Sequence, residues 1–167
     1  MKKLVLGLFI FGLTIQVNAQ TVELSETIIS INSEYMHSID SENTCTYVKK
    51  LEQALLEYNP SNLSDLYDSK NDIYNVTFQI PEGRIVASFN KDGKIVKTHE
   101  KYNNIRLPEA VIASISEKYP KSNIIEDVYV IKFHCDEDAR EQVYKVTLKN
   151  DGENIITVRT NNKGEFI

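Results

Sequence analysis

Apolar and polar residues alternate with a period of two along five segments of the chain, a pattern typical of half-buried antiparallel strands. The segments are residues 74–79, 84–90, 128–133, 144–148 and 156–159. Residues that favour tight turns (Asn, Asp, Pro and Gly) gather beside these segments, at 81–83, 90–93, 150–152 and 161–164. The pattern therefore predicts hairpins of antiparallel strands that bury one face and leave the other in water.

Two other segments place apolar residues at helical spacing. Residues 44–58 have one apolar face, with Thr44 as the expected N-cap and Pro60 just beyond the end. Residues 108–119 have a second such face, and Pro108 suits the first turn of a helix. The apolar positions are Tyr47, Val48, Leu51, Leu55 and Tyr58 in the first helix and Val111, Ile112, Ile115 and Tyr119 in the second.

Short similarities recur along the chain at a separation of 70 or 71 residues. Residues 74–78 resemble residues 144–148 at an offset of 70, and residues 92–95 resemble residues 163–166 at an offset of 71. The one-residue difference falls at a turn, where insertions are tolerated. An internal repeat explains these similarities, and the alternative is a chance likeness between two hairpins.

Together the elements predict an α+β fold built from tandem repeats. The first repeat unit covers residues 44–102 and the second covers residues 103–167, each a helix followed by an antiparallel meander. A unit of about 60 residues buries too little surface to be secure alone. We therefore expect one domain over residues 20–167, in which both units share one antiparallel sheet and the helices cover one face of it.

The N-terminus has the order of a secretory signal peptide. In residues 1–19 two lysines precede an apolar stretch at 4–13 and a small-residue cleavage site. The stretch is shorter than the roughly 20 residues of a membrane-spanning helix. We expect cleavage before Gln20 and export to the periplasm or the extracellular space, with no membrane span in the mature chain. A buried N-terminal helix is the alternative. Residues 20–43 are of uncertain structure, fitting either a helix or an edge strand at 21–24.

The composition and the motifs of the chain exclude some classes of function. The chain has 19 basic and 24 acidic residues, a formal charge of −5, whereas non-specific binding to nucleic acid needs a basic surface. The sequence has no Gly-x-Ser-x-Gly nucleophile elbow and no glycine-rich phosphate loop. We therefore predict a non-enzymatic protein with no catalytic residues, no cofactor and no nucleic-acid partner. An uncharacterised hydrolase is the alternative.

Cys45 and Cys135 are the two cysteines of the chain. An exported compartment permits a disulfide between them, and two separate thiols are the alternative. Residues 134–138 gather an imidazole, a thiol and carboxylates, which are metal-ligand types. Neighbouring residues of a strand point to opposite faces, so His134 and Cys135 are not expected to converge. We predict a solvated hairpin tip and no metal site.

The order of motifs along most of the chain carries a family resemblance. A strand at 86–89 leads into Asp92-Gly93-Lys94, a second strand follows, and Leu107-Pro108 opens a helix that ends at Tyr119-Pro120. Over roughly residues 45–167 the chain in this respect resembles the PepSY-like family of small secreted bacterial proteins, a family similar in fold to the β-lactamase-inhibitor protein. The resemblance implies two helix-plus-sheet repeats that form one curved antiparallel sheet. It implies no catalytic residues.

The sheet face turned away from the helices is predicted to be polar. Its positions alternate with the apolar ones, and those we single out are Thr77, Arg84, Ser88, Lys145, Thr147, Thr157 and Arg159. Such a surface can bind a protein or peptide through many hydrogen bonds, and a merely solvated face is the alternative. We predict an exported binding module, inhibitor-like, that engages an unknown protein or peptide through this face. The alternative function is an exported small-ligand or metal-binding sensor.

Overall fold

The computed structural model describes residues 32–39, 45–60, 72–136 and 139–167. The predicted signal peptide and most of the N-terminal segment lie outside the described residues. Within the described ranges no helix combines the length and the apolar character needed to cross a membrane.

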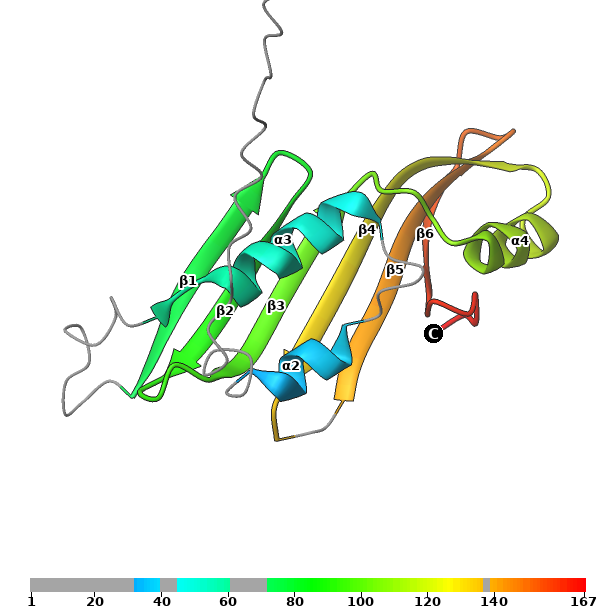
Figure 1. The fold of residues 1–167 in the computed structure, drawn as a ribbon. Helices are drawn as coiled ribbons and strands as arrows, with labels where there is room; N and C mark the ends of the chain where they lie inside the picture. Colours follow the sequence, from blue (N-terminus) through cyan, green and yellow to red (C-terminus); the bar gives the residue numbers. More distant parts are fainter. Residues whose placement is uncertain (1–31, 40–44, 61–71, 137–138) are drawn as a thin grey trace, which may run out of the picture.

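The fold is built on one sheet of six antiparallel strands that follow one another in chain order (Figure 1). Each strand pairs with the next one along the chain, so every connection within the sheet joins neighbours. The strands are β1 (Ile73–Ile80), β2 (Gly83–Asn90), β3 (Ile95–Asn103), β4 (Ser122–His134), β5 (Ala139–Asn150) and β6 (Ile155–Thr160). The predicted α+β class with a single antiparallel sheet is confirmed.

Within the described part of the chain, three helices accompany the sheet: α2 (Ser33–Ser38), α3 (Thr46–Glu57) and α4 (Glu109–Lys118). Figure 1 shows α3 and α2 lying across one side of the strands, with α4 at the β6 end. The two helices expected from the apolar spacing are present. The N-cap of α3 is Cys45, whereas the predicted cap Thr44 lies outside the described residues. The short α2 falls in the segment whose structure the sequence left uncertain.

The core lies between the helices and the inward side chains of the strands. One cluster of buried residues joins α2, α3 and α4 to β2 through β6, and its largest members include Tyr35, Leu55, Phe89, Tyr102, Ile115, Ile131 and Leu148. Two apolar helix positions differ from expectation, because Tyr47 and Ile112 are exposed. On α3 the buried face instead includes Glu52, whose carboxylate has a cationic partner described below.

Strand β3 is the element that alternation failed to predict. Its inward positions include Thr98 and Glu100, both fully buried, while Lys97 and Lys101 are exposed on the other side. Polar residues therefore occupy both faces, and no apolar–polar alternation marks this part of the strand. The hairpin turn at 90–93 and the family resemblance implied that a strand follows, but neither gave its bounds or its register.

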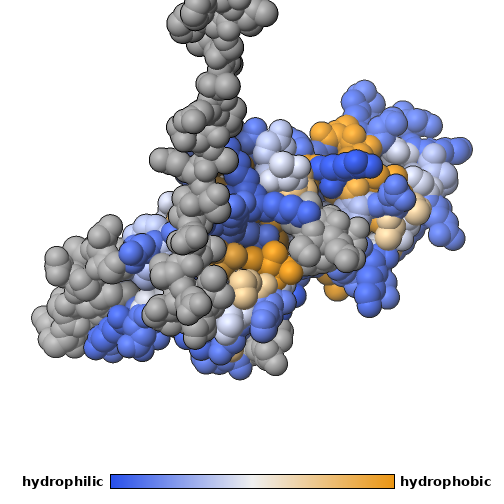
Figure 2. Space-filling view, in the orientation of Figure 1, coloured by the Kyte–Doolittle hydropathy of each residue, from blue (hydrophilic) through white to orange (hydrophobic). Residues whose placement is uncertain are grey.

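The helix side of the molecule is largely polar at its surface, with patches of apolar residues (Figure 2). Among the apolar side chains exposed there are Ile124 and Ile156, which pair across the sheet with the buried Leu148. These two isoleucines therefore lie at the edge of the core and extend it to the surface.

The two hairpins that the internal similarity links have matching registers. Tyr74 pairs with Phe89 in β1–β2, and Tyr144 pairs with Thr160 in β5–β6. The turns after β2 and β6 also match, because each has a glycine with positive φ, Gly93 at 77° and Gly164 at 81°. The offset of 70 or 71 residues between the similar segments thus aligns β1 with β5. It leaves β4 without a counterpart in the first unit.

Candidate binding surface

The open face is the side of the sheet turned away from the core, and the register decides which residues it holds. All seven sequence-predicted residues lie on it. On β1 and β2, Gln79 pairs with Arg84 and Asn75 with Ser88, and Thr77 occupies the position between Asn75 and Gln79 on the same face. On β5 and β6, Lys145 pairs with Arg159 and Thr147 with Thr157. The structure thus places the predicted residues in two groups, one at each side of the sheet.

Strands β3 and β4 separate these two groups and supply residues that the sequence argument did not include. From β3 come Lys97, His99 and Lys101, and from β4 come Val128, Val130 and Lys132. The β4 positions were readable from alternation, because Val128 and Val130 alternate with the buried Tyr129 and Ile131. The β3 positions had no such signal. No described helix covers this face, since α2, α3 and α4 all bury their apolar residues in the core cluster.

The open face is strongly cationic in a protein whose formal charge is −5. Its strand positions hold seven basic residues other than histidine, namely Arg84, Lys97, Lys101, Lys132, Lys145, Lys149 and Arg159. The acidic residues on these strand positions are Glu126 and Glu141. The excess acid of the chain therefore lies elsewhere, and this side of the sheet presents a local field of the opposite sign.

Two of these cations have acidic partners. Lys132 Nζ lies 2.9 Å from Glu141 Oε2, and Lys149 Nζ lies 2.9 Å from Glu153 Oε1. The hydrogen bond from Lys132 is the main reason that the pKa of Glu141 is lowered from its usual value, and the nearby charge of Arg159 adds to this effect. Both pairs are exposed to solvent, where an ion pair contributes little to stability.

Four other cations stand opposite one another in two like-charged pairs. Arg84 is the direct cross-strand neighbour of Lys101, and Lys145 is the direct neighbour of Arg159. None of the four forms an ion pair with a described residue. Like charges directly opposite on neighbouring strands are destabilising. We call these the two cation pairs of the open face.

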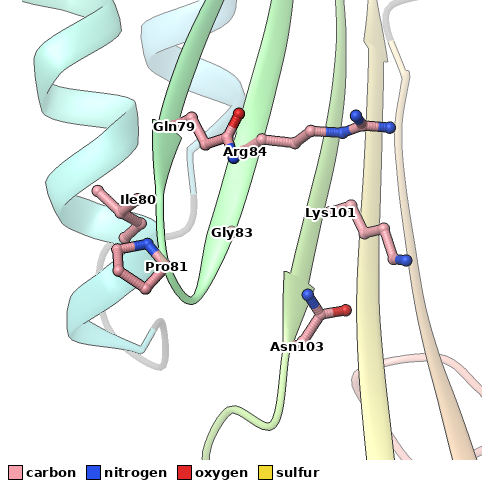
Figure 3. A pocket seen from close by; sticks show the side chains of 7 residues that line it. All are labelled: Gln79, Ile80, Pro81, Gly83, Arg84, Lys101 and Asn103. Atoms are coloured by element: carbon pink, nitrogen blue, oxygen red, sulfur yellow. The ribbon is translucent and has the colours of Figure 1, made fainter.

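A shallow hollow of about 270 Å³ lies beside the first cation pair, at the β1–β2 turn. Its lining combines Arg84 and Lys101 with the side-chain amides of Gln79 and Asn103. Figure 3 shows the Arg84 and Lys101 side chains extending in the same direction across neighbouring strands. Guanidinium, ammonium and amide groups all donate hydrogen bonds, so the hollow suits an anionic group such as a carboxylate.

Hydroxyl and amide groups complete the face. The hydroxyl oxygens of Thr147 and Thr157 lie 3.4 Å apart, and the Ser88 hydroxyl donates to Asn75 Oδ1 at 2.6 Å. These groups are exposed, and they make no contribution to the core. Their arrangement leaves a surface with many hydrogen-bonding groups on both sides of the central strands.

The tip of the β4–β5 hairpin corrects one step of the sequence argument. One ligand atom from each of His134, Cys135 and Asp136 lies within 4.8 Å of the others. The expectation that His134 and Cys135 diverge was wrong, because β4 ends at His134 and Cys135 already belongs to the turn. His134 Nδ1 accepts the backbone N–H of Asp136 at 3.3 Å, which folds the turn back on itself. The remaining acidic residues of this segment, 137–138, lie outside the described residues.

The two cysteines are both free thiols in the structure. Cys45 caps α3, and Cys135 follows β4, where its Sγ donates to Asp136 Oδ1 at 3.5 Å. Burial is the main reason that the pKa of Cys135 is raised, followed by that neighbouring carboxylate. A raised thiol pKa means less thiolate at neutral pH and hence a less reactive cysteine.

A buried polar cluster beneath α2 and α3 has no sequence signal. Glu100 of β3 accepts three hydroxyl hydrogen bonds, from Tyr35 at 3.1 Å, Thr98 at 3.0 Å and Tyr102 at 3.0 Å. Burial raises the pKa of Glu100 above its usual value, although Arg140 and the hydroxyl donors oppose that rise. The donors come from α2 and from β3 itself, so the carboxyl group ties the short helix to the sheet.

Arg140 of β5 joins both helices to the same region. Its guanidinium donates to the carboxylate of Glu52 on α3 and to the backbone oxygen of Ser38 in α2 at 3.1 Å. The side chains of Arg140 and Glu52 are only 6% and 2% exposed. Burial alone would lower the pKa of Arg140, but the carboxylates of Glu52 and Glu100 outweigh this and raise it. This pair is the ionic link between the helices and the far half of the sheet.

The open face and the buried cluster thus differ in how their polar groups are paired. The cluster has groups from four elements (α2, α3, β3 and β5), already engaged with one another, on the covered side. The open face has the two cation pairs, which form no ion pair with a described residue, on the side that no described helix covers. No protein-family model, no curated protein and no solved structure matches this chain.

Proposed function

We propose that this chain is an exported, non-enzymatic binding protein that engages a protein or peptide through the open face. One observation carries the proposal: this face gathers polar and cationic side chains, in two cation pairs, that serve neither the core nor a described ion pair. A protein gains nothing in stability from such pairs. Their presence is explained if the stabilising partner is another molecule.

The composition of the face supports a protein partner. Interfaces between proteins combine a less polar centre with a polar rim and about one hydrogen bond per 100–200 Å². Here Val128 and Val130 lie between the two cation pairs, and hydroxyl groups lie beyond them. The surface thus offers both contact types. An inhibitor-like role, in which the bound protein is an enzyme that is restrained, fits the same geometry.

The test is affinity capture from the native exported fraction with paired variants. We expect Lys145→Ala with Arg159→Ala to reduce recovery of the partner while leaving the melting temperature nearly unchanged, because exposed substitutions cost within about 0.5 kcal/mol each. The matched control is Lys49→Ala with Lys50→Ala, which removes the same charge from the exposed surface of α3. Equal recovery with both variants would contradict the proposal.

Export and family membership belong to the same proposal. We infer that residues 1–19 are removed on export and that the mature protein starts at Gln20, which mass analysis of exported material checks. An intact Met1 on cytosolic protein would contradict it. The PepSY-like resemblance, with its curved sheet, is supported by the order of helix and three strands that occurs twice along the chain.

The tandem repeat is likewise part of this proposal. The matching registers and turns of β1–β2 and β5–β6 support a duplicated hairpin. The same offset leaves β4 without a counterpart, so the duplication we propose is that of the hairpins with their turns.

A second candidate function, metal or small-ligand sensing, rests on the convergence of His134, Cys135 and Asp136. The three groups together offer nitrogen, sulfur and oxygen ligands, a set that suits Zn²⁺. Titration with Co²⁺, followed by the absorption of its thiolate complex, tests this function. Loss of the signal in Cys135→Ser would support a site, and the absence of any signal would contradict it.

A further inference from the structure

The open face combines two cation pairs with an apolar strip between them. The first pair, Arg84 and Lys101, spans β2 and β3, and the second, Lys145 and Arg159, spans β5 and β6. The centres of these pairs are three strand spacings apart across the sheet, which is about 14 Å at about 4.8 Å per strand. They are also displaced by two residues along the strands, because Lys101 aligns with Val130 whereas Lys145 aligns with Val128, so the full separation is about 16 Å. A ligand that neutralises both pairs must therefore carry negative charge at two places separated by this distance.

Apolar side chains occupy the surface between the two pairs. Val130 and Val143 are direct cross-strand neighbours on β4 and β5, and Val128 lies beside Lys145. Val143 is buried, and Val128 and Val130 are half-buried. A ligand with only charged groups would leave these valines in contact with its ionic parts. A ligand with apolar side chains between its charges would cover the exposed parts of Val128 and Val130.

We propose that the open face binds an acidic protein segment in which two carboxylate clusters are about 16 Å apart and enclose apolar residues. This inference rests on the proposed function and names the chemistry of its partner. Each carboxylate cluster would sit over one cation pair, and the amides of Gln79 and Asn103 would donate further hydrogen bonds at the first pair. In an extended segment the two clusters would be about five residues apart, at about 3.3 Å per residue.

The charge pattern favours a protein segment over a uniform polyanion. Glu126 and Glu141 interrupt the cationic surface, on the strands that carry the apolar strip. A nucleic acid, an acidic polysaccharide or an anionic membrane presents closely repeated charges, some of which would face these carboxylates and valines. An acidic peptide can place its charges at the two pairs alone. The spacing thus provides specificity as well as attraction.

The test uses three synthetic peptides and titrates each into the purified protein. The spaced peptide is acetyl-Glu-Glu-Val-Val-Val-Glu-Glu-amide, which separates its two clusters by about 16 Å when extended. The contiguous peptide, acetyl-Glu-Glu-Glu-Glu-Val-Val-Val-amide, has the same composition. The neutral peptide replaces every Glu of the spaced one by Gln. Calorimetry gives the affinities, and the methyl resonances of Val128, Val130 and Val143 locate the binding.

We expect the spaced peptide to bind most tightly, to shift the three valine methyl resonances and to bind more weakly at high salt. Replacing either cation pair by Gln, in Arg84→Gln with Lys101→Gln or in Lys145→Gln with Arg159→Gln, should weaken it about fivefold. The control variant, Lys49→Gln with Lys50→Gln, should bind as the wild type does. Phosphatidylglycerol vesicles and heparin should bind more weakly than the spaced peptide at equal charge concentration.

Several results would overturn this inference. Equal binding of the spaced and contiguous peptides would show that the spacing of the carboxylates does not matter. Equal binding of the neutral and spaced peptides would show that negative charge is not required. Tighter binding of vesicles or heparin would assign the face to another class of partner. If neither acidic peptide bound, the inference would also be overturned. The proposed function fails on a different result, namely recovery of the captured partner that does not change when residues of the open face are substituted.

Discussion

Replacing Arg140 by methionine removes the one cation in the buried cluster. The substitution keeps the length of the side chain and leaves Glu52, which is 2% exposed, without its guanidinium partner. It also removes the donor to the Ser38 backbone oxygen. The pKa of Glu100 should rise further, because Arg140 opposes the effect of burial there. The perturbation thus strikes the contacts by which β5 holds both α2 and α3.

The expected cost follows from the burial of this pair. Breaking a buried ion pair by removing one partner costs about 3–5 kcal/mol, because a buried charge is left uncompensated. A domain of this size is stable by roughly 5–15 kcal/mol, so the loss is a large share of the total. With about 2–4 °C of melting temperature per kcal/mol, Arg140→Met should lower the melting temperature by about 10 °C.

Urea unfolding followed by far-ultraviolet circular dichroism measures the free energy of unfolding of each variant. The matched control is Lys132→Met, which breaks the exposed pair with Glu141 and should cost less than about 1 kcal/mol. The double variant Arg140→Met with Glu52→Leu should recover most of the loss, because apolar replacement of both partners is often neutral or better. If Arg140→Met cost no more than Lys132→Met, the described ionic link would be refuted.

Three further predictions concern single residues. Lys101→Glu should raise the free energy of unfolding by about 0.2–1 kcal/mol, because the repulsion between residue 101 and Arg84 becomes an attraction. The same change should weaken binding of the spaced peptide. A loss of stability would contradict the repulsion that we assign to the cation pairs. Gly164→Ala should destabilise by about 1 kcal/mol or more, because φ is positive and the new Cβ would meet the Ala110 backbone oxygen; an unchanged urea midpoint would contradict this. Because the pKa of Glu100 is raised, the native state keeps a proton that the unfolded chain releases near pH 4.5. The free energy of unfolding therefore falls as the pH rises from about 4.5 through the pKa of Glu100 in the native state. Glu100→Gln should remove this decline. An identical pH dependence of the urea midpoint in the wild type and the variant would exclude a contribution of Glu100 to it.

The parts of the fold that follow from sequence are those with local periodicity. Strands β1 and β2 alternate along their whole length, and β4 alternates only from Asp127 onward, after the bulge between Ile124 and Glu126. The apolar spacing of α3 and α4 is that of a helix. The cation pair of Lys145 and Arg159 could be anticipated, because two residues of one hairpin share a face by their parity alone. Such inferences need no knowledge of distant parts of the chain.

The parts that could not be predicted depend on contacts distant in sequence. Glu52 and Arg140 are 88 residues apart, and nothing local distinguishes either from an exposed charge. The burial of Glu100 needs Tyr35, 65 residues away, to supply a donor. The pair of Arg84 and Lys101 was invisible because β3 has polar residues on both faces, so its register could not be placed.

Lysine footprinting tests most directly whether a partner occupies the open face. The protein is acetylated alone and in its complex with the partner captured from the exported fraction, and mass spectrometry gives the modification of each lysine. Lys101 and Lys145 are exposed on the open face, and Lys49 and Lys50 are exposed on α3. We predict that Lys101 and Lys145 become protected in the complex while Lys49 and Lys50 react as before. Protection of Lys49 and Lys50 with unchanged Lys101 and Lys145 would contradict the account.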